Sequence, residues 1–66
     1  MFNKDKFNGL IAEAGLTKEK LSKILGISSV TLHRKIARSG DFTKKEILKM
    51  TEVLDKEKTI HLFFGY

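Results

Sequence analysis

The sequence contains no cysteine, so neither a disulfide bond nor a thiolate metal site can stabilise its fold. It has no apolar run approaching the ~20 residues that cross a membrane. It also lacks the charged and then apolar leader of a secretory signal peptide. These features predict a soluble cytoplasmic protein.

Residue combinations that carry catalysis are missing as well. There is no nucleophile with a base and no pair of carboxylates in a pattern that indicates a pocket. The two histidines, His33 and His61, are far apart in the sequence and have no cysteine beside them, which argues against a metal site. A glycine-rich phosphate loop is also missing. The sequence therefore predicts no enzyme activity, no metal and no cofactor.

Positive charge is concentrated in one part of the chain. The 66 residues are enough for one small domain, spanning 1–66, and carry a net charge of +5. Between Thr17 and Lys45 there are eight Lys or Arg and two acidic residues, whereas the rest of the chain has five basic and six acidic residues. Because the whole excess lies in one segment, the pattern favours a polyanionic partner for that segment.

The beginning of the chain predicts a helix with one buried face. Asn3 can cap this helix, because its side-chain oxygen can accept an N–H that the first turn leaves unpaired. Apolar residues then recur at helical spacing. They are Phe7, Leu10, Ile11 and Ala14.

The end of the chain predicts one further helix and one ambiguous segment. Thr43 followed by Glu46 is a capping box, which marks the start of a helix that runs to about Leu54. Its inner face carries Ile47, Met50, Thr51 and Leu54. Asp55 can cap a fifth helix, but residues 56–64 also contain β-branched and aromatic side chains that suit a strand.

The stretch from Leu16 to Ile36 predicts two short helices joined by a tight turn. Thr17 can cap the first helix. Gly26 ends it, because glycine reaches the left-handed conformation without steric cost. Ser28 and Ser29 can cap the second helix, over about 28–37. The apolar positions that would pack the two helices together are Leu21, Ile24 and Leu25 in the first and Leu32 and Ile36 in the second.

Two segments of this stretch resemble the lambda repressor/Cro-type (XRE) helix-turn-helix regulators, namely Thr17–Ser28 and Thr31–Ile36. The later FTKKEILKMTEVL, followed shortly by LFFG, resembles small phage-encoded regulators of Gram-positive hosts. Ser22 stands where the family usually has alanine, and Lys18 where it usually has glutamine. Serine still allows close helix packing and lysine still reaches a phosphate.

The resemblance implies a compact all-α bundle of four to five helices of the lambda repressor-like DNA-binding type, with helices 2 and 3 forming the helix-turn-helix. It also implies a Cro-like transcriptional regulator that represses by occupying operator DNA. One such module covers few base pairs. We therefore expect a homodimer on an inverted repeat with half-sites ~34 Å apart.

Two sets of side chains are predicted to contact the DNA. Short or hydrogen-bonding side chains on the outer face of the second helix suit base edges in the major groove. They are Ser29, Val30, His33 and Arg34. Basic and hydroxyl side chains around them, together with the free N–H groups of the helix that Thr43 begins, suit phosphates. They are Lys18, Ser28, Thr31, Lys35, Arg38, Thr43 and Lys44.

Two further interpretations remain open at this point. The C-terminal aromatic residues Phe63, Phe64 and Tyr66 either cover the small core or form the dimer contact. The chain as a whole either binds DNA or acts as an antirepressor that binds another phage repressor protein. Ile24 and Val30 favour the second role, because both are apolar where a surface facing DNA or solvent is more often polar.

Overall fold

The computed structural model describes residues 2–65, and this range contains five α-helices. They are α1 (Lys4–Glu13), α2 (Lys18–Leu25), α3 (Ser29–Ala37), α4 (Lys44–Val53) and α5 (Lys56–Phe64). Residues 2–65 contain no strand, so the ambiguous segment 56–64 is helical and the all-α prediction is confirmed. None of the helices in this range has the length and apolar content needed to span a membrane.

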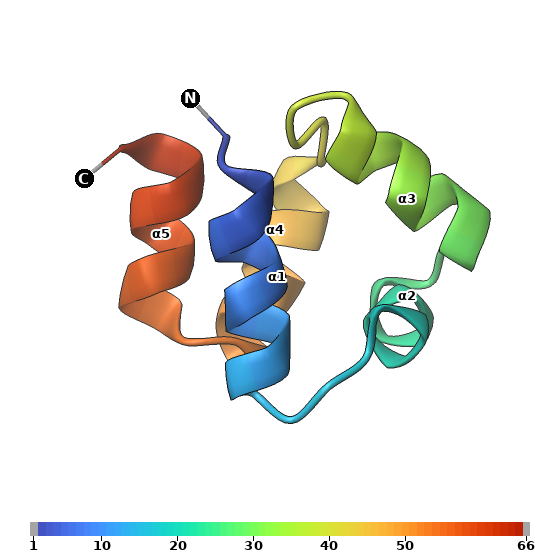
Figure 1. Cartoon of the computed structure of the whole chain (residues 1–66), viewed down its shortest axis with the longest axis horizontal. Coiled ribbons are helices and arrows are strands. Elements are labelled where there is room, and N and C mark those ends of the chain that lie inside the picture. The colour runs from blue at the N-terminus through green and yellow to red at the C-terminus, as the bar shows by residue number, and fades with distance from the viewer. Residues whose placement is uncertain (1, 66) are drawn as a thin grey trace.

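The helices surround a single core in a molecule that measures 29 × 24 × 21 Å. Helix α1 lies at the centre, with α5 on one side and α2 and α3 on the other, and α4 lies behind α1 (Figure 1). Helices α3 and α5 therefore occupy opposite sides of the molecule (Figure 1). A surface on the outside of α3 is consequently separate from one on the outside of α5.

Each helix begins directly after a residue whose side-chain oxygen accepts a hydrogen bond from the backbone N–H three residues further on. These residues are Asn3, Thr17, Ser28, Thr43 and Asp55. The sequence predicted all five, and such caps typically stabilise a helix by about 1 kcal/mol. Local side-chain chemistry thus sets where the helices start.

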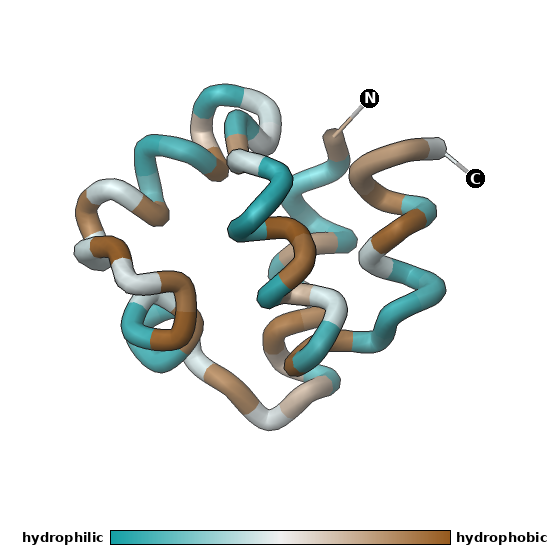
Figure 2. The backbone as a smooth tube through the Cα atoms, turned by 180° about the vertical axis from the view of Figure 1, so that it is seen from behind, coloured by the Kyte–Doolittle hydropathy of each residue, from teal (hydrophilic) through white to brown (hydrophobic). Residues whose placement is uncertain are grey.

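The core is formed by hydrophobic side chains from all five helices or the residues next to them. In residues 2–65 the buried ones are Phe7, Leu10, Ile11, Leu21, Leu25, Leu32, Ile36, Met50, Leu54 and Leu62. Hydrophobic positions, brown in Figure 2, recur along the helices instead of forming one long run. Four expected core positions differ. Ala14 is exposed because α1 ends at Glu13, and Ile24 is 37% exposed. Ile47 and Thr51, predicted for the inner face of α4, are half-buried and do not belong to the core cluster.

Four phenylalanine rings connect parts of the chain that are distant in sequence. They are Phe2, Phe7, Phe42 and Phe63, with ring centroids 5.5–6.5 Å apart. Phe7 is fully buried, while Phe2, Phe42 and Phe63 are half-buried around it. This aromatic cluster joins α1 and α5 to the N-terminal segment and to the loop before α4, so Phe63 helps to cover the core.

The loop between α3 and α4 requires glycine at one position. Gly40 has a φ angle of +76°, and a Cβ atom built there would collide with the ring of Phe2. Any other residue would therefore meet both an unfavourable backbone conformation and a member of the aromatic cluster. This contact joins the loop after α3 to the N-terminal segment.

Thr59 in α5 offers a test of core energetics. It is fully buried, and its hydroxyl has no hydrogen-bond partner among the described residues. An unsatisfied buried hydroxyl is destabilising, so Thr59→Val is expected to raise the free energy of unfolding by about 1 kcal/mol in urea titrations. The matched control is Thr51→Val, which removes a hydroxyl that donates to the carbonyl of Leu48 at 2.6 Å and should not stabilise. Destabilisation by Thr59→Val would contradict the prediction.

Candidate nucleic-acid interface

A three-residue turn joins α2 to α3. Gly26 lies in the left-handed region with a φ angle of +75°. The N–H of Ile27 then donates back to the carbonyl of Ser22 at 3.0 Å, which closes the end of α2. Ser28 caps α3 with its hydroxyl, which accepts the N–H of Thr31 at 3.1 Å. The chain therefore changes direction within three residues, and α3 starts at a defined point.

Buried packing fixes α3 against α2. Leu21 and Leu32 are fully buried, and Leu25 and Ile36 are each 5% exposed. Ser22, at the position where the resembled family usually has alanine, is buried as well, and its hydroxyl donates to the carbonyl of Glu19 at 2.6 Å. The small side chain thus fits the interface without leaving its own polar group unpaired.

The outer face of α3 is open to solvent. The four residues predicted to face DNA bases, Ser29, Val30, His33 and Arg34, are all exposed, and Val30 is 66% exposed. By the helical period Val30 and Arg34 point away from Leu32 and Ile36, and His33 lies at the flank. Ser29 stands seven residues before Ile36, on the same side of the helix, and is exposed in the first turn of α3. The structure thus leaves all four side chains open to solvent. Their contact with bases stays a prediction.

The residues predicted to contact phosphates differ in exposure and in the partners they have within the chain. Arg38, which follows α3, and Lys44, which begins α4, are exposed, and Lys18, which begins α2, is half-buried. Ser28 and Thr31 are bonded to each other, with the Ser28 hydroxyl 2.9 Å from that of Thr31. Their primary role in the structure is therefore to start α3.

Lys35 has partners within the chain. Its ammonium group forms an ion pair with Glu46, 3.2 Å from Oε1, and donates to the carbonyl of Asp41 at 3.2 Å. The same group lies 5.9 Å from the ring centroid of Phe42. These contacts connect α3 to the start of α4. They engage the ammonium group that the sequence predicted to bind a phosphate. We therefore leave Lys35 out of the proposed phosphate contacts.

The start of α4 already holds a carboxylate. Oε1 of Glu46 accepts the backbone N–H of Thr43 at 2.8 Å, while the Thr43 hydroxyl accepts the N–H of Glu46 at 3.2 Å. Burial alone would raise the pKa of the Glu46 carboxyl, but the Thr43 N–H and the Lys35 ammonium more than offset this and lower it. The N–H and hydroxyl of Thr43 are thus engaged in capping α4. A phosphate contact at the start of α4 stays a prediction.

The chain was compared with protein-family models, with curated proteins and with solved structures. No match was found in any of the three comparisons. A functional proposal for this chain must therefore come from its own residues and their arrangement.

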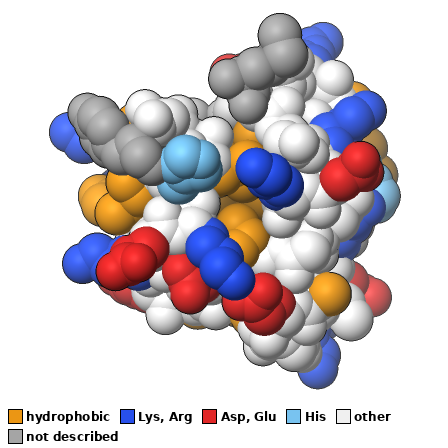
Figure 3. All heavy atoms as spheres, turned by 60° about the vertical axis from the view of Figure 1, so that its left-hand side comes forward, with side chains coloured by type: hydrophobic (Ala, Val, Ile, Leu, Met, Phe, Trp, Pro, Cys, Tyr) orange, Lys and Arg blue, Asp and Glu red, His pale blue; other side chains and the backbone are white. Residues whose placement is uncertain are grey.

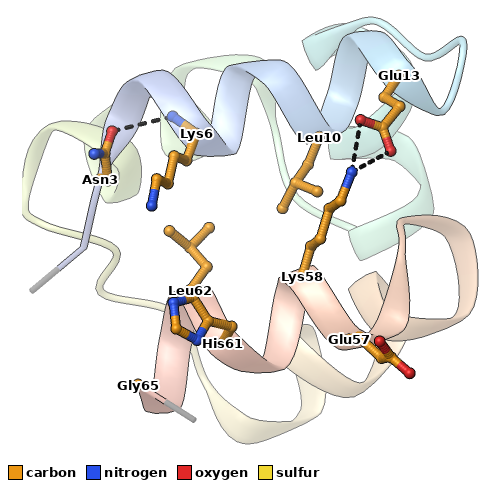
Figure 4. Close-up of a pocket in the computed structure, with 9 residues that line it drawn as sticks. All are labelled: Asn3, Lys6, Leu10, Glu13, Glu57, Lys58, His61, Leu62 and Gly65. Atoms are coloured by element: carbon orange, nitrogen blue, oxygen red, sulfur yellow. Dashed lines mark hydrogen bonds and ion pairs between the residues drawn. The ribbon is translucent and has the colours of Figure 1, made fainter.

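A hollow of about 900 Å³ lies on the side of the molecule away from α3. It is formed between α1 and α5, with Leu10 and Leu62 at its base and Lys6 at one end (Figure 4). At the other end Lys58 contacts Glu13 at 3.0 Å, and this contact raises the pKa of the lysine. Figure 3 shows hydrophobic side chains near the middle of this face, with basic and acidic side chains around them. The hollow is separate from the outer face of α3.

The three residues predicted for a dimer contact have different positions. Phe63 belongs to the aromatic cluster, and Phe64 is 52% exposed at the end of α5. Tyr66 lies outside the described residues. The dimer contact through these residues stays a prediction.

Two features beside α3 were not foreseen from the sequence. One is Glu46 as the partner of Lys35. The other is a shallow cleft of about 370 Å³ that is lined by Lys4 of α1 together with Lys18 and His33. Lys4 precedes the basic segment and has Asp5 beside it, so charge counting gave it no special place. The observation that reveals it is a cleft lined by residues of α1, α2 and α3, which only the fold supplies.

Proposed function

We propose that this chain is a sequence-specific DNA-binding regulator of transcription, of the lambda repressor/Cro-like helix-turn-helix type, with α3 in the major groove. The observation that carries the proposal is the outer face of α3, where Ser29, Val30, His33 and Arg34 are exposed together on a helix whose other side is buried. A helix about 10–12 Å across fits a major groove about 12 Å wide.

The charges around α3 support a polyanionic partner. Between Thr17 and Lys45 there are eight basic residues, and in the described part of the chain Lys35 is the one among them that pairs with an acidic side chain. The other seven remain available to neutralise phosphates, which supplies affinity that falls steeply with added salt. Lys18, Arg38 and Lys44 are the proposed phosphate contacts of this group.

Repression by occupancy of the operator is the simplest mechanism for a domain of this size. One copy contacts few base pairs, so we propose that two copies bind an inverted repeat with half-sites ~34 Å apart. Such a protein acts in the bacterial cytoplasm, where its operator is located, and needs neither a cofactor nor an enzymatic activity. Sedimentation equilibrium that finds one copy per operator would contradict the dimer.

Arg34→Ala tests the proposed reading of bases. Arginine can contact guanine O6 and N7 together, and this contact is worth about 1–3 kcal/mol of discrimination against other bases. Selection of binding sites from random duplex DNA is therefore expected to give an inverted repeat with the natural protein. With Arg34→Ala the preference should be lost at one position in each half-site and kept at the others.

Arg38→Ala is the matched control for this experiment. It removes the same side chain just after α3, at a proposed phosphate contact. Affinity is then expected to fall about equally for all sequences, and the dependence of affinity on salt should become weaker. If the natural protein selects no site, or if both variants keep every base preference, α3 does not read DNA through Arg34.

A second candidate function rests on two exposed apolar side chains. Ile24 is 37% exposed and Val30 is 66% exposed, on the two helices that form the proposed interface. An apolar patch beside α3 suits a protein partner, so the chain could act as an antirepressor that binds another phage repressor. Stable pairing with such a repressor, without operator binding, would favour this role. A steep loss of DNA affinity with added salt favours the first role.

A further inference from the structure

The shallow cleft beside α3 is formed by three helices. Its walls include Lys4 and Asn8 from α1, Lys18 from α2 and His33 from α3, and its volume is about 370 Å³. Lys4 is exposed and Lys18 is half-buried, and in residues 2–65 neither forms an ion pair with an acidic side chain. Two lysines that are far apart in the sequence therefore line the same cleft.

Charge in the cleft favours an anion. Asp5 lines it as well and carries the one negative charge among its walls, against the two positive charges of Lys4 and Lys18. Lysine binds a phosphate oxygen as a point charge, and the amide of Asn8 can donate a hydrogen bond to the same group. A singly charged phosphodiester suits this balance better than a neutral ligand does.

The cleft is continuous with the outer face of α3. His33 belongs to both, because it is exposed with the predicted base-facing residues and also lines the cleft. A helix that lies in the major groove has a sugar-phosphate backbone along each side. A backbone that runs along the α1 side of α3 therefore passes the mouth of this cleft.

We propose that Lys4, together with Lys18, holds a backbone phosphate of the operator in this cleft. The inference rests on the proposed function and extends the DNA-binding surface to α1, outside the basic segment. A contact made jointly by α1 and α2 fixes the position of α3 along the groove. Lys4 is thus a positioning residue for base recognition, and it reads no base itself.

Lys4→Ala tests this inference, with Lys56→Ala as a matched control. Lys4 is the first residue of α1 and Lys56 is the first residue of α5, and both side chains are exposed. Replacing either lysine with alanine lowers the net charge by the same amount. Affinity for the selected operator is measured by fluorescence anisotropy over a series of salt concentrations. For Lys4→Ala we expect affinity to fall roughly three- to tenfold and the slope of log affinity against log salt to fall by about 0.9.

Lys56→Ala is expected to change operator affinity less than about twofold, because a distant charge is screened at physiological salt. Circular dichroism of both variants shows whether they keep the helical fold. If Lys4→Ala behaves like Lys56→Ala while Arg34→Ala still relaxes the site, the inference is wrong and the proposed function stands. If the natural protein binds no duplex DNA, the proposed function is wrong and the inference falls with it.

Discussion

Replacing Phe7 with alanine is expected to leave most of the protein unfolded in buffer without denaturant. Phe7 is fully buried at the centre of the aromatic cluster, with ring centroids 5.5 Å from that of Phe2 and 5.7 Å from that of Phe42. Truncating a buried phenylalanine to alanine lowers the free energy of unfolding by about 3–5 kcal/mol. Less apolar surface is then buried on folding, and a cavity is left in the core. In a domain this small the hydrophobic core rarely supplies more than about 3–5 kcal/mol of folding stability.

The measurement is the helical circular dichroism signal during urea titration, compared with a phenylalanine outside the cluster. Phe64 is 52% exposed, so Phe64→Ala is expected to change the free energy of unfolding by less than about 1 kcal/mol. This control removes the same side chain from the same small protein. A midpoint for Phe7→Ala close to that of the natural protein would show that the aromatic cluster does not hold the helices together.

The starts of the helices could be predicted because a capping interaction spans only three residues. Thr17 and Thr43, for example, each accept the N–H three positions ahead, and each is recognisable from the sequence without knowledge of the fold. The left-handed turn at Gly26 is equally local. Together with the helical spacing of apolar residues, these signals predict the order of the helices and the outward face of α3.

Contacts between distant residues could not be predicted in the same way. Lys35 and Glu46 are eleven residues apart and belong to different helices, so no local spacing links them. Charge counting treated every lysine of the basic segment as available to a ligand, although the fold pairs this one internally. Knowing which cations are paired requires the positions of α3 and α4 relative to each other.

The same reason explains why the cleft and the aromatic cluster were missed. Phe2 and Phe63 lie at opposite ends of the sequence, yet their ring centroids are 5.5 Å apart. Lys4 and His33 likewise line one cleft, although they belong to α1 and α3. Packing at the ends of the chain therefore affects α3 in two ways: the aromatic cluster holds the loop that follows it, and α1 adds a cation beside its outer face.

Glu46→Ala is expected to lower the free energy of unfolding by about 2–4 kcal/mol, a large share of the stability of so small a domain. The side chain of Glu46 is 12% exposed and that of Lys35 is 22% exposed, so removing the carboxylate leaves a largely buried cation without its ion-pair partner. The acceptor for the Thr43 N–H is lost at the same time. Urea titration of the variant measures the change, and Glu52→Ala, on the exposed side of α4, is the matched control.

A second substitution at Lys35 and a pH series distinguish the contribution of the Lys35–Glu46 ion pair from that of the helix cap at Thr43. Adding Lys35→Met to Glu46→Ala should recover part of the lost stability, because the unpaired cation is then gone. The pKa of Glu46 is lowered from its ordinary value of 4.5, so its contribution is complete above that pH and is lost as the pH falls through the lowered pKa. The difference between Glu46→Ala and the natural protein should therefore be constant near neutral pH and shrink in acid. A difference that persists unchanged in acid would show that the carboxylate charge is not what joins α3 to α4.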